Sequence, residues 1–201
     1  MPAAGVTYQR TREMTIDELL LENRIVFLIG EINQASAARI MMQMLYLENM
    51  KRGNDIHLYI NSPGGAVDDT LAIYDTMRFL SSPVNTYCLG RAYSGAAVVL
   101  TAGTKGKRYI LPHAKVMIHQ PYGGVTGQAE DIRIQAEQII KMKRELTRII
   151  AEHTGQTFDQ VHKDGERDKY FSAEEALKYG LVDEVLTTPP KAGEGVLSGV
   201  R

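Results

Sequence analysis

The chain has 201 residues, of which 44% are hydrophobic and 23% are charged, and its formal net charge is −1. This composition predicts one globular domain with its own core, and the near-zero charge argues against nucleic acid or an anionic membrane surface as the main partner. The single cysteine, Cys88, excludes an intramolecular disulfide, and we expect it to be a small buried side chain. The first residues lack the pattern of a secretory signal and no apolar run could span a bilayer, so we expect a cytoplasmic location.

Strand-like and helix-like segments alternate over the first 120 residues, after a polar, aperiodic stretch at 1–15. Short apolar runs predict strands, and longer stretches with helical spacing predict helices. The alternation predicts an α/β fold of βαβ units, with a largely parallel sheet covered by helices on both faces. The predicted strands are 24–30, 55–62, 84–90, 107–112 and 115–120, and the predicted helices are 36–49, 66–80 and a short buried helix directly after Ser94.

The second part of the chain contains one long amphipathic helix at 128–155, which follows a flexible loop at 123–127 and ends at Gly155. Its length of about 26 residues corresponds to about 39 Å, which is more than a compact domain of this size can cover. We therefore expect part of the helix to project toward another chain; the alternative is that it wraps around its own domain. Its apolar stripe comprises Ile132, Ala136, Ile139, Leu146 and Ile150.

A shorter helix and a strand are predicted after the long helix, at 172–180 and 182–186. The last stretch is rich in proline and glycine, which is typical of a flexible tail.

The segment NSPGG at 61–65 closes the second predicted strand, and in open α/β sheets sites form at the carboxyl ends of strands. Its two glycines leave backbone N–H groups accessible to an anion, either a phosphate or a developing oxyanion. The chain has no P-loop spacing, and a plain turn is the alternative explanation of this segment. No HExxH, CxxC or carboxylate-rich pattern predicts a metal site.

Ser94 lies at a predicted strand-to-helix corner, with Ala92 and Ala96 two residues away on either side and Gly95 directly after it. A nucleophilic serine needs an exposed Oγ, small neighbours and a free amide after it for the oxyanion. The sequence AYSGA supplies these features. The alternative role for this serine is that of a helix N-cap.

A nucleophilic serine also needs a base, and His119 is the histidine that ends an apolar strand-like run, KVMI. The alternative is a structural histidine held by hydrogen bonds. The carboxylate that would orient the imidazole cannot be selected from the pattern of the 24 acidic residues. Asp168 is one candidate, and for it the alternative is a solvated surface charge.

Together these segments resemble the proteolytic subunit of the caseinolytic (Clp) protease family. The resemblance spans about residues 20–186 and implies a Clp protease/crotonase-like fold of repeated ββα/βαβ units, with a largely parallel sheet and a long projecting handle helix. It also implies an N-terminal arm at 1–19, a catalytic domain at 20–187 with its handle helix at about 128–153, and a flexible tail at 188–201. It rests on YINSPGG (59–65), SGA around Ser94, MIHQPYGG (117–124), GQAEDI (127–132), HTGQ (153–156) and ERDKYFSAEEALKYGLVDEV (166–185).

The resemblance implies a serine endopeptidase in which Ser94 is the nucleophile, His119 the general base and Asp168 the orienting carboxylate. It further implies an oxyanion hole formed by the amides of Gly65 and Gly95. An extended substrate would pair with the backbone like an added strand. The implied substrate-binding residues are Gly64, Val67 and Tyr122.

The implied partners follow from the same resemblance. The subunits would form two stacked heptameric rings, homomeric or mixed, with the long helix interlocking them. An AAA+ unfoldase that uses ATP would deliver unfolded polypeptides for cleavage to short peptides, so this chain itself needs no cofactor, nucleic acid or membrane. Tyr59, Phe79 and Leu111 match positions of the unfoldase docking pocket.

Two residues beside Ser94 depart from the family pattern: Tyr93 replaces an alanine and Gly95 replaces a methionine. We expect the glycine to aim its amide less firmly and the tyrosine to change or obstruct the specificity pocket. The N-terminal arm is also shorter than the family's axial hairpin. These departures support an alternative hypothesis, a poorly active or inactive subunit of a mixed ring beside a standard catalytic subunit. A third hypothesis is an acyl-CoA hydratase of the crotonase type, which shares the fold and the paired-amide oxyanion hole.

Overall fold

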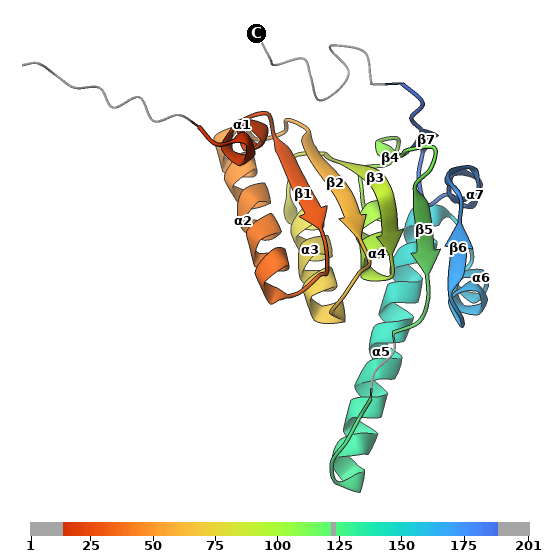
Figure 1. Ribbon diagram of the computed structural model, residues 1–201. Coiled ribbons are helices and arrows are strands. Elements are labelled where there is room, and N and C mark those ends of the chain that lie inside the picture. Colours follow the sequence, from red (N-terminus) through yellow and green to blue (C-terminus); the bar gives the residue numbers. More distant parts are fainter. Residues whose placement is uncertain (1–13, 122–123, 189–201) are drawn as a thin grey trace, which may run out of the picture.

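The computed structural model describes residues 14–121 and 124–188. It has the α/β fold expected from the sequence, with one sheet, helices packed behind it and one long helix that projects away (Figure 1). The strands are β1 (Ile25–Ile29), β2 (Ile56–Ser62), β3 (Val84–Tyr93), β4 (Arg108–Ile110), β5 (Lys115–Ile118), β6 (Lys169–Phe171) and β7 (Glu184–Val185). The helices are α1 (Ile16–Glu22), α2 (Gln34–Met50), α3 (Val67–Phe79), α4 (Gly95–Thr101), α5 (Ala129–Thr154), α6 (Phe158–Asp164) and α7 (Ala173–Tyr179).

The sheet is largely parallel, with the strand order β1-β2-β3-β4-β7, and β5 pairs in parallel with β3 and antiparallel with β6. The long strand β3 changes partner along its length, because Thr86–Cys88 pair with β4 whereas Arg91–Tyr93 pair with β5. Gly90, with φ of +76°, lies between the two pairings. The partner change places the ends of β3 and β5 side by side at the carboxyl edge of the sheet.

Among the described helices, α2, α3 and α4 lie behind β1 to β3, on one face of the sheet (Figure 1). The burial of β2 alternates accordingly, since every second side chain is buried. Over these strands the other face carries a row of stacked aromatic rings and, among residues 14–121 and 124–188, no layer of helices. The predicted helix cover on both faces is therefore wrong for this part of the described sheet. The ring centroids are 5.6 Å apart for Phe27–Tyr59, 4.5 Å for Tyr59–Tyr87 and 4.9 Å for Tyr87–Tyr109.

Helix α5 is 26 residues long, and only its C-terminal part packs into the domain. Its buried side chains are Thr147, Ile149 and Ile150. The N-terminal part extends below the rest of the domain (Figure 1) and leaves Ile132, Ile134 and Ile140 exposed. The helix therefore projects, as the sequence analysis expected from its length, and does not wrap around its own domain.

Three short elements were not predicted from the sequence: α1, α6 and β6. Helix α1 begins at Ile16 behind a capping box formed by Thr15 and Glu18, so the last residues of the predicted arm are helical. The rest of that arm, residues 1–13, and most of the predicted tail, residues 189–201, lie outside the described residues.

Candidate active site

Ser94 lies at the corner between β3 and α4, in a backbone conformation that side chains rarely adopt, with φ of +55° and ψ of −123°. Its amide donates a hydrogen bond to the Met117 carbonyl at 2.8 Å, and its own carbonyl accepts from Ala97 at 2.9 Å. Such backbone strain costs about 1–3 kcal/mol and persists only where the surroundings hold it. Ser94 occupies the N-cap position of α4, but its side chain makes no capping hydrogen bond. The hydroxyl is instead directed toward a histidine.

The structure brings together the three residues that the sequence proposed for nucleophilic chemistry. Ser94 Oγ lies 2.9 Å from His119 Nε2, and His119 Nδ1 lies 3.0 Å from Asp168 Oδ1. In the neutral imidazole, Nδ1–H donates to the Asp168 carboxylate and Nε2 accepts the Ser94 hydroxyl proton, which is the arrangement that makes a serine nucleophilic. The His119 side chain is almost buried, whereas that of Asp168 is 55% exposed.

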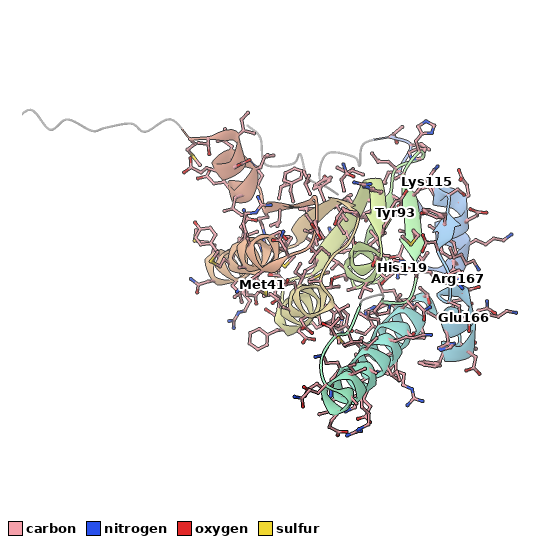
Figure 2. The ribbon with its side chains drawn as sticks, turned by 60° about the horizontal axis from the view of Figure 1, so that its bottom comes forward. Met41, Tyr93, Lys115, His119, Glu166 and Arg167 are labelled. Carbon is pink, nitrogen blue, oxygen red and sulfur yellow. The ribbon has the colours of Figure 1, made fainter. Side chains whose placement is uncertain are left out.

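The pairing of β5 with β6 explains why His119 and Asp168 meet although 49 residues separate them. The two strands are antiparallel, and Ile118 lies opposite Lys169. The residue after Ile118 and the residue before Lys169 are therefore neighbours at the same end of the pair. Figure 2 shows His119 beside the segment that carries Glu166 and Arg167, which leads directly to Asp168.

The NSPGG segment lies directly against the Ser94 corner. Its Gly64 has φ of +87°, and a Cβ at this position would lie 2.5 Å from the Tyr93 carbonyl oxygen and 2.7 Å from Ser94 Cβ. The Gly64 amide donates to the buried hydroxyl of Ser62 at 3.1 Å. The backbone of Gly64 therefore lies closer to the backbone of the Ser94 corner than a side chain at position 64 would allow. Glycine is required here for this steric reason as well as for its positive φ.

Gly65 is also required by close packing, since a Cβ there would lie 2.0 Å from the Ile32 carbonyl oxygen. Gly65 and Ile32 form a parallel bridge in which Ile32 donates to Gly64 and Ala66 donates to Ile32. In such a bridge the N–H of Gly65 itself points away from Ile32. Within the described residues, the amides of Gly65 and Gly95 have no hydrogen-bond acceptor. Both glycines line the same cavity as Ser94.

A cavity of about 430 Å³ opens beside Ser94 and His119. Its wall is formed by the NSPGG segment, by the first turns of α3 and α4, and by the packed part of α5. The lining combines aliphatic side chains with polar groups, which include the Glu31 carboxylate and the side chains of Ser94 and His119. The apolar lining side chains are Val67, Val98, Ile118, Pro121, Leu146 and Ile150.

Comparison with known proteins agrees with this geometry. The family model described as Clp protease matches residues 8–189. The chain is also 55% identical to the ATP-dependent Clp protease proteolytic subunit 1 of Rhodopirellula baltica. The alignment extends over 192 residues and covers 96% of this chain and 85% of that protein. This chain belongs to the Clp protease family. The membership confirms the resemblance, the fold class and the serine peptidase class expected from the sequence, and it disfavours the acyl-CoA hydratase.

Several contacts hold the segment that carries Asp168, and the sequence analysis did not identify them. The amide of Gln120 donates to the Gly165 carbonyl at 2.6 Å, and its side-chain Nε2 donates to the Glu166 carbonyl at 3.1 Å. Lys169, the residue directly after Asp168, forms an ion pair with Asp164, with Nζ and Oδ1 2.6 Å apart. The only sequence signal for the first contact is the glutamine that directly follows His119.

Tyr93 does not line the cavity, so the expectation that it would obstruct the specificity pocket of this Clp protease family member is wrong. Its ring packs edge-on against Tyr170 of β6, with centroids 5.5 Å apart, and the Arg91 guanidinium lies 5.8 Å from its centroid. Tyr93 and Tyr170 lie opposite Met117 on its two sides in the sheet. The tyrosine therefore links β3 to the strand that follows Asp168.

The remaining predicted residues lie apart from the Ser94 corner or outside the described residues. Val67 begins α3 and lines the cavity, whereas Tyr122 is not among the described residues. Tyr59 lies in the aromatic row, where burial raises its pKa to about 12. Phe79 is 83% exposed at the end of α3, and Leu111 is 40% exposed directly after β4. An unfoldase docking role for these three residues stays a prediction.

The described residues give two further findings about ligands and membranes. No described group of three or more His, Cys, Asp or Glu side chains could hold a metal ion. Among the helices of residues 14–121 and 124–188, none is both long and apolar enough to cross a bilayer.

Proposed function

We propose that this chain is the proteolytic subunit of a self-compartmentalised, ATP-dependent protease and that it hydrolyses peptide bonds with Ser94, His119 and Asp168. The observation that carries the proposal is the continuous hydrogen-bonded row from the Ser94 hydroxyl through His119 to the Asp168 carboxylate. Family membership supports the same reaction class. The complete row favours an active subunit over an inactive structural one.

In the proposed reaction, Ser94 Oγ attacks the carbonyl carbon of the scissile peptide bond while His119 Nε2 accepts the hydroxyl proton. Asp168 holds the ring through Nδ1–H and stabilises the imidazolium. The peptide C–N bond then breaks as His119 transfers the proton to the leaving amine. Water, activated by the same imidazole, hydrolyses the acyl-enzyme and regenerates the Ser94 hydroxyl.

The amides of Gly65 and Gly95 are proposed to stabilise the oxyanion of the tetrahedral intermediate. The lack of a hydrogen-bond acceptor for either amide within the described residues and the position of both glycines on the Ser94 cavity support this role. Gly95 lies in a fully buried helix, and this packing favours a firmly held amide in spite of the missing side chain. The extended substrate is proposed to lie along Gly64 to Val67. A substrate-binding role for Tyr122, which lies outside the described residues, is proposed from the family resemblance.

The assembly is part of the proposal. Two stacked heptameric rings, either homomeric or mixed, would enclose the active sites, and the exposed apolar side chains on the projecting part of α5 support a contact with another subunit. An AAA+ unfoldase would consume ATP and deliver unfolded polypeptides, while this chain needs no cofactor of its own. A cytoplasmic location is also proposed, and the buried free thiol of Cys88 is consistent with it.

Replacing His119 by alanine tests the proposed chemistry. Because triad members act as a unit, we expect the hydrolysis rate of a fluorogenic peptide by the assembled protein to fall by about 10³-fold or more. Size-exclusion chromatography of the same variant controls for assembly. A fall of less than about tenfold in a correctly assembled variant would contradict the assignment. Native mass spectrometry of the chain alone and with a second subunit distinguishes homomeric from mixed rings.

A further inference from the structure

Tyr93, Met117 and Tyr170 lie side by side in one row that crosses the strands β3, β5 and β6. The carbonyl of Met117 also accepts the hydrogen bond from the Ser94 amide, at 2.8 Å. Each residue of the proposed triad is one or two positions along the chain from a member of this row, namely Ser94 after Tyr93, His119 after Met117 and Asp168 before Tyr170. The row is therefore the nearest point at which the three strands that carry the triad are joined.

The two tyrosine rings of this row meet on the face of the sheet that is turned away from the core. Residues that pair across neighbouring strands have their side chains on the same face, and successive residues point to opposite faces. The adjacent row is buried in the core, with at most 4% of each residue exposed, and consists of Ala92, Val116 and Phe171. Tyr93 and Tyr170 therefore meet on the other face, across Met117, with their ring planes at 87° and their centroids 5.5 Å apart.

The Tyr93 ring also contacts Arg91, whose guanidinium carbon lies 5.8 Å from the ring centroid. An edge-on contact between two rings and a cation over a ring both favour one orientation of the aromatic side chain. Figure 2 shows Tyr93 on the strand beside the one that leads to His119. Since Tyr93 does not line the cavity beside Ser94, its contacts act on the sheet and not on the space that a substrate would enter.

Strand β6, which directly follows Asp168, is held by few backbone contacts. It has three residues, and among the described strands it pairs with β5 alone. The position of so short an edge strand depends on its side-chain contacts. Phe171 anchors β6 to the core on one face, and Tyr93 holds Tyr170, the residue nearer to Asp168, on the other face. Without the Tyr93 ring, the end of β6 next to Asp168 could shift relative to the Ser94 corner.

We propose that Tyr93 is a positioning residue, whose contact with Tyr170 holds Asp168 in place. The strand behind Asp168 thereby stays aligned with the Ser94 corner, and His119 keeps both of its hydrogen bonds, at 2.9 and 3.0 Å. A displacement of about 1 Å in such a row can lower the rate by about 10²-fold. The inference rests on the proposed peptidase function and adds to it a residue that acts through Asp168.

The test compares Tyr93→Ala, Tyr93→Phe, Tyr170→Ala and the double alanine variant as full-length, assembled proteins, with kcat and KM measured for one fluorogenic peptide. Tyr74→Ala is the matched control. Tyr74 makes an edge-on contact of the same kind with His153, at 5.7 Å and 82°, but it belongs to α3 and does not line the cavity. Urea denaturation measures the stability that each variant loses, and size-exclusion chromatography measures its assembly.

Tyr93→Ala and Tyr170→Ala are expected to lower kcat by about tenfold to a hundredfold and to change KM by less than about twofold, because Asp168 is misaligned while the cavity is intact. Tyr93→Phe keeps the ring and should retain kcat within about threefold. The double variant should be no slower than either single variant, because both substitutions remove the same contact. Tyr74→Ala should lose stability but keep kcat within about threefold.

Removal of the Asp168 side chain distinguishes a positioning role from a merely structural one. The measured quantity is the rate at which a fluorophosphonate labels Ser94, which requires no turnover. If Tyr93 acts through Asp168, Tyr93→Ala slows labelling by about tenfold or more when Asp168 is present. In the Asp168→Ala background it slows labelling by less than about twofold, because no carboxylate remains to be positioned.

Equal slowing of labelling by Tyr93→Ala in both backgrounds would overturn the inference. An unchanged kcat in Tyr93→Ala, a loss of activity in Tyr93→Phe or an equal fall of kcat in Tyr74→Ala would do the same. If Tyr93→Ala does not assemble, Tyr170→Ala decides the case by the same measurements, since Tyr170 is 54% exposed. If the wild type neither labels nor hydrolyses the peptide, the proposed function fails; if it does both and the Tyr93 and Tyr170 variants match it, only the positioning role fails.

Discussion

Substitution of Gly64 by alanine perturbs the contact on which the geometry of the active site depends. The added methyl group would lie 2.5 Å from the Tyr93 carbonyl oxygen, 2.7 Å from Ser94 Cβ and 2.9 Å from the Gly95 amide nitrogen. Two of these atoms are backbone and the third is a Cβ, so none can move away by a simple change of rotamer. The NSPGG segment and the Ser94 corner must therefore separate.

The expected magnitude has two parts. Alanine in the left-handed conformation of Gly64, at φ of +87°, costs about 1–2 kcal/mol of stability. The separation also displaces Gly65 from Gly95, which is comparable to removing one of two oxyanion donors and corresponds to about 10²- to 10³-fold in kcat, or about 2.7–4 kcal/mol in the activation free energy. We therefore expect a loss of stability greater than this conformational cost, because the overlap adds to it, and a large loss of catalysis.

Gly53→Ala is the matched control for this prediction. Gly53 has nearly the same conformation, with φ of +80°, but no atom lies within 4 Å of the position of its Cβ. Urea denaturation should show the conformational cost alone in Gly53→Ala and a larger loss of stability in Gly64→Ala, because only there does the methyl group overlap its neighbours. Peptide hydrolysis by assembled protein should fall strongly only in Gly64→Ala. Equal kcat in the two variants would refute the argument that the close approach of Gly64 maintains the oxyanion site.

Two other predictions concern the support of Asp168 and the stability of the fold. Gln120→Leu removes the side-chain hydrogen bond to the segment before Asp168. Steady-state kinetics should therefore show kcat reduced by about tenfold to a hundredfold, with little change in KM. An unchanged kcat would contradict this positioning role. Hydrogen bonds from Ser81 and Ser82 lower the pKa of Glu48 to about 2, below its ordinary value. The ionised carboxylate therefore stabilises the fold fully above about pH 4.5, and this contribution is lost as the pH falls toward 2. Urea denaturation of Glu48→Gln should therefore show a larger destabilisation at pH 7 than at pH 3, and an equal loss at both would count against the assignment.

The main architecture follows from the sequence because its signals are local. Apolar runs such as RIVFLIG form strands, and the helical stripe of α5 extends far enough to require projection beyond the domain. Strand β6 was missed because three residues carry too little pattern, and it exists only through its pairing with β5. The extent of β3 was underestimated at Gly90, where the strand continues and changes its partner from β4 to β5.

The candidate site was partly predictable for the same reason. Ser94 is marked by its own neighbours, and His119 by the strand it ends. The choice of Asp168 needed the family resemblance, because the register of β5 and β6 brings it to His119 and no local pattern encodes that register. The role of Tyr93 could not be derived from the sequence, since it depends on a contact with a distant element.

Covalent labelling of Ser94 by a fluorophosphonate tests the central claim most directly. The probe reacts with a serine only where a base activates the hydroxyl and an oxyanion site stabilises the adduct. The account predicts that assembled wild-type protein is labelled on the peptide containing Ser94, that Ser94→Ala abolishes labelling and that His119→Ala slows it strongly. Absence of labelling in assembled wild-type protein, or labelling that persists in Ser94→Ala, would contradict the account.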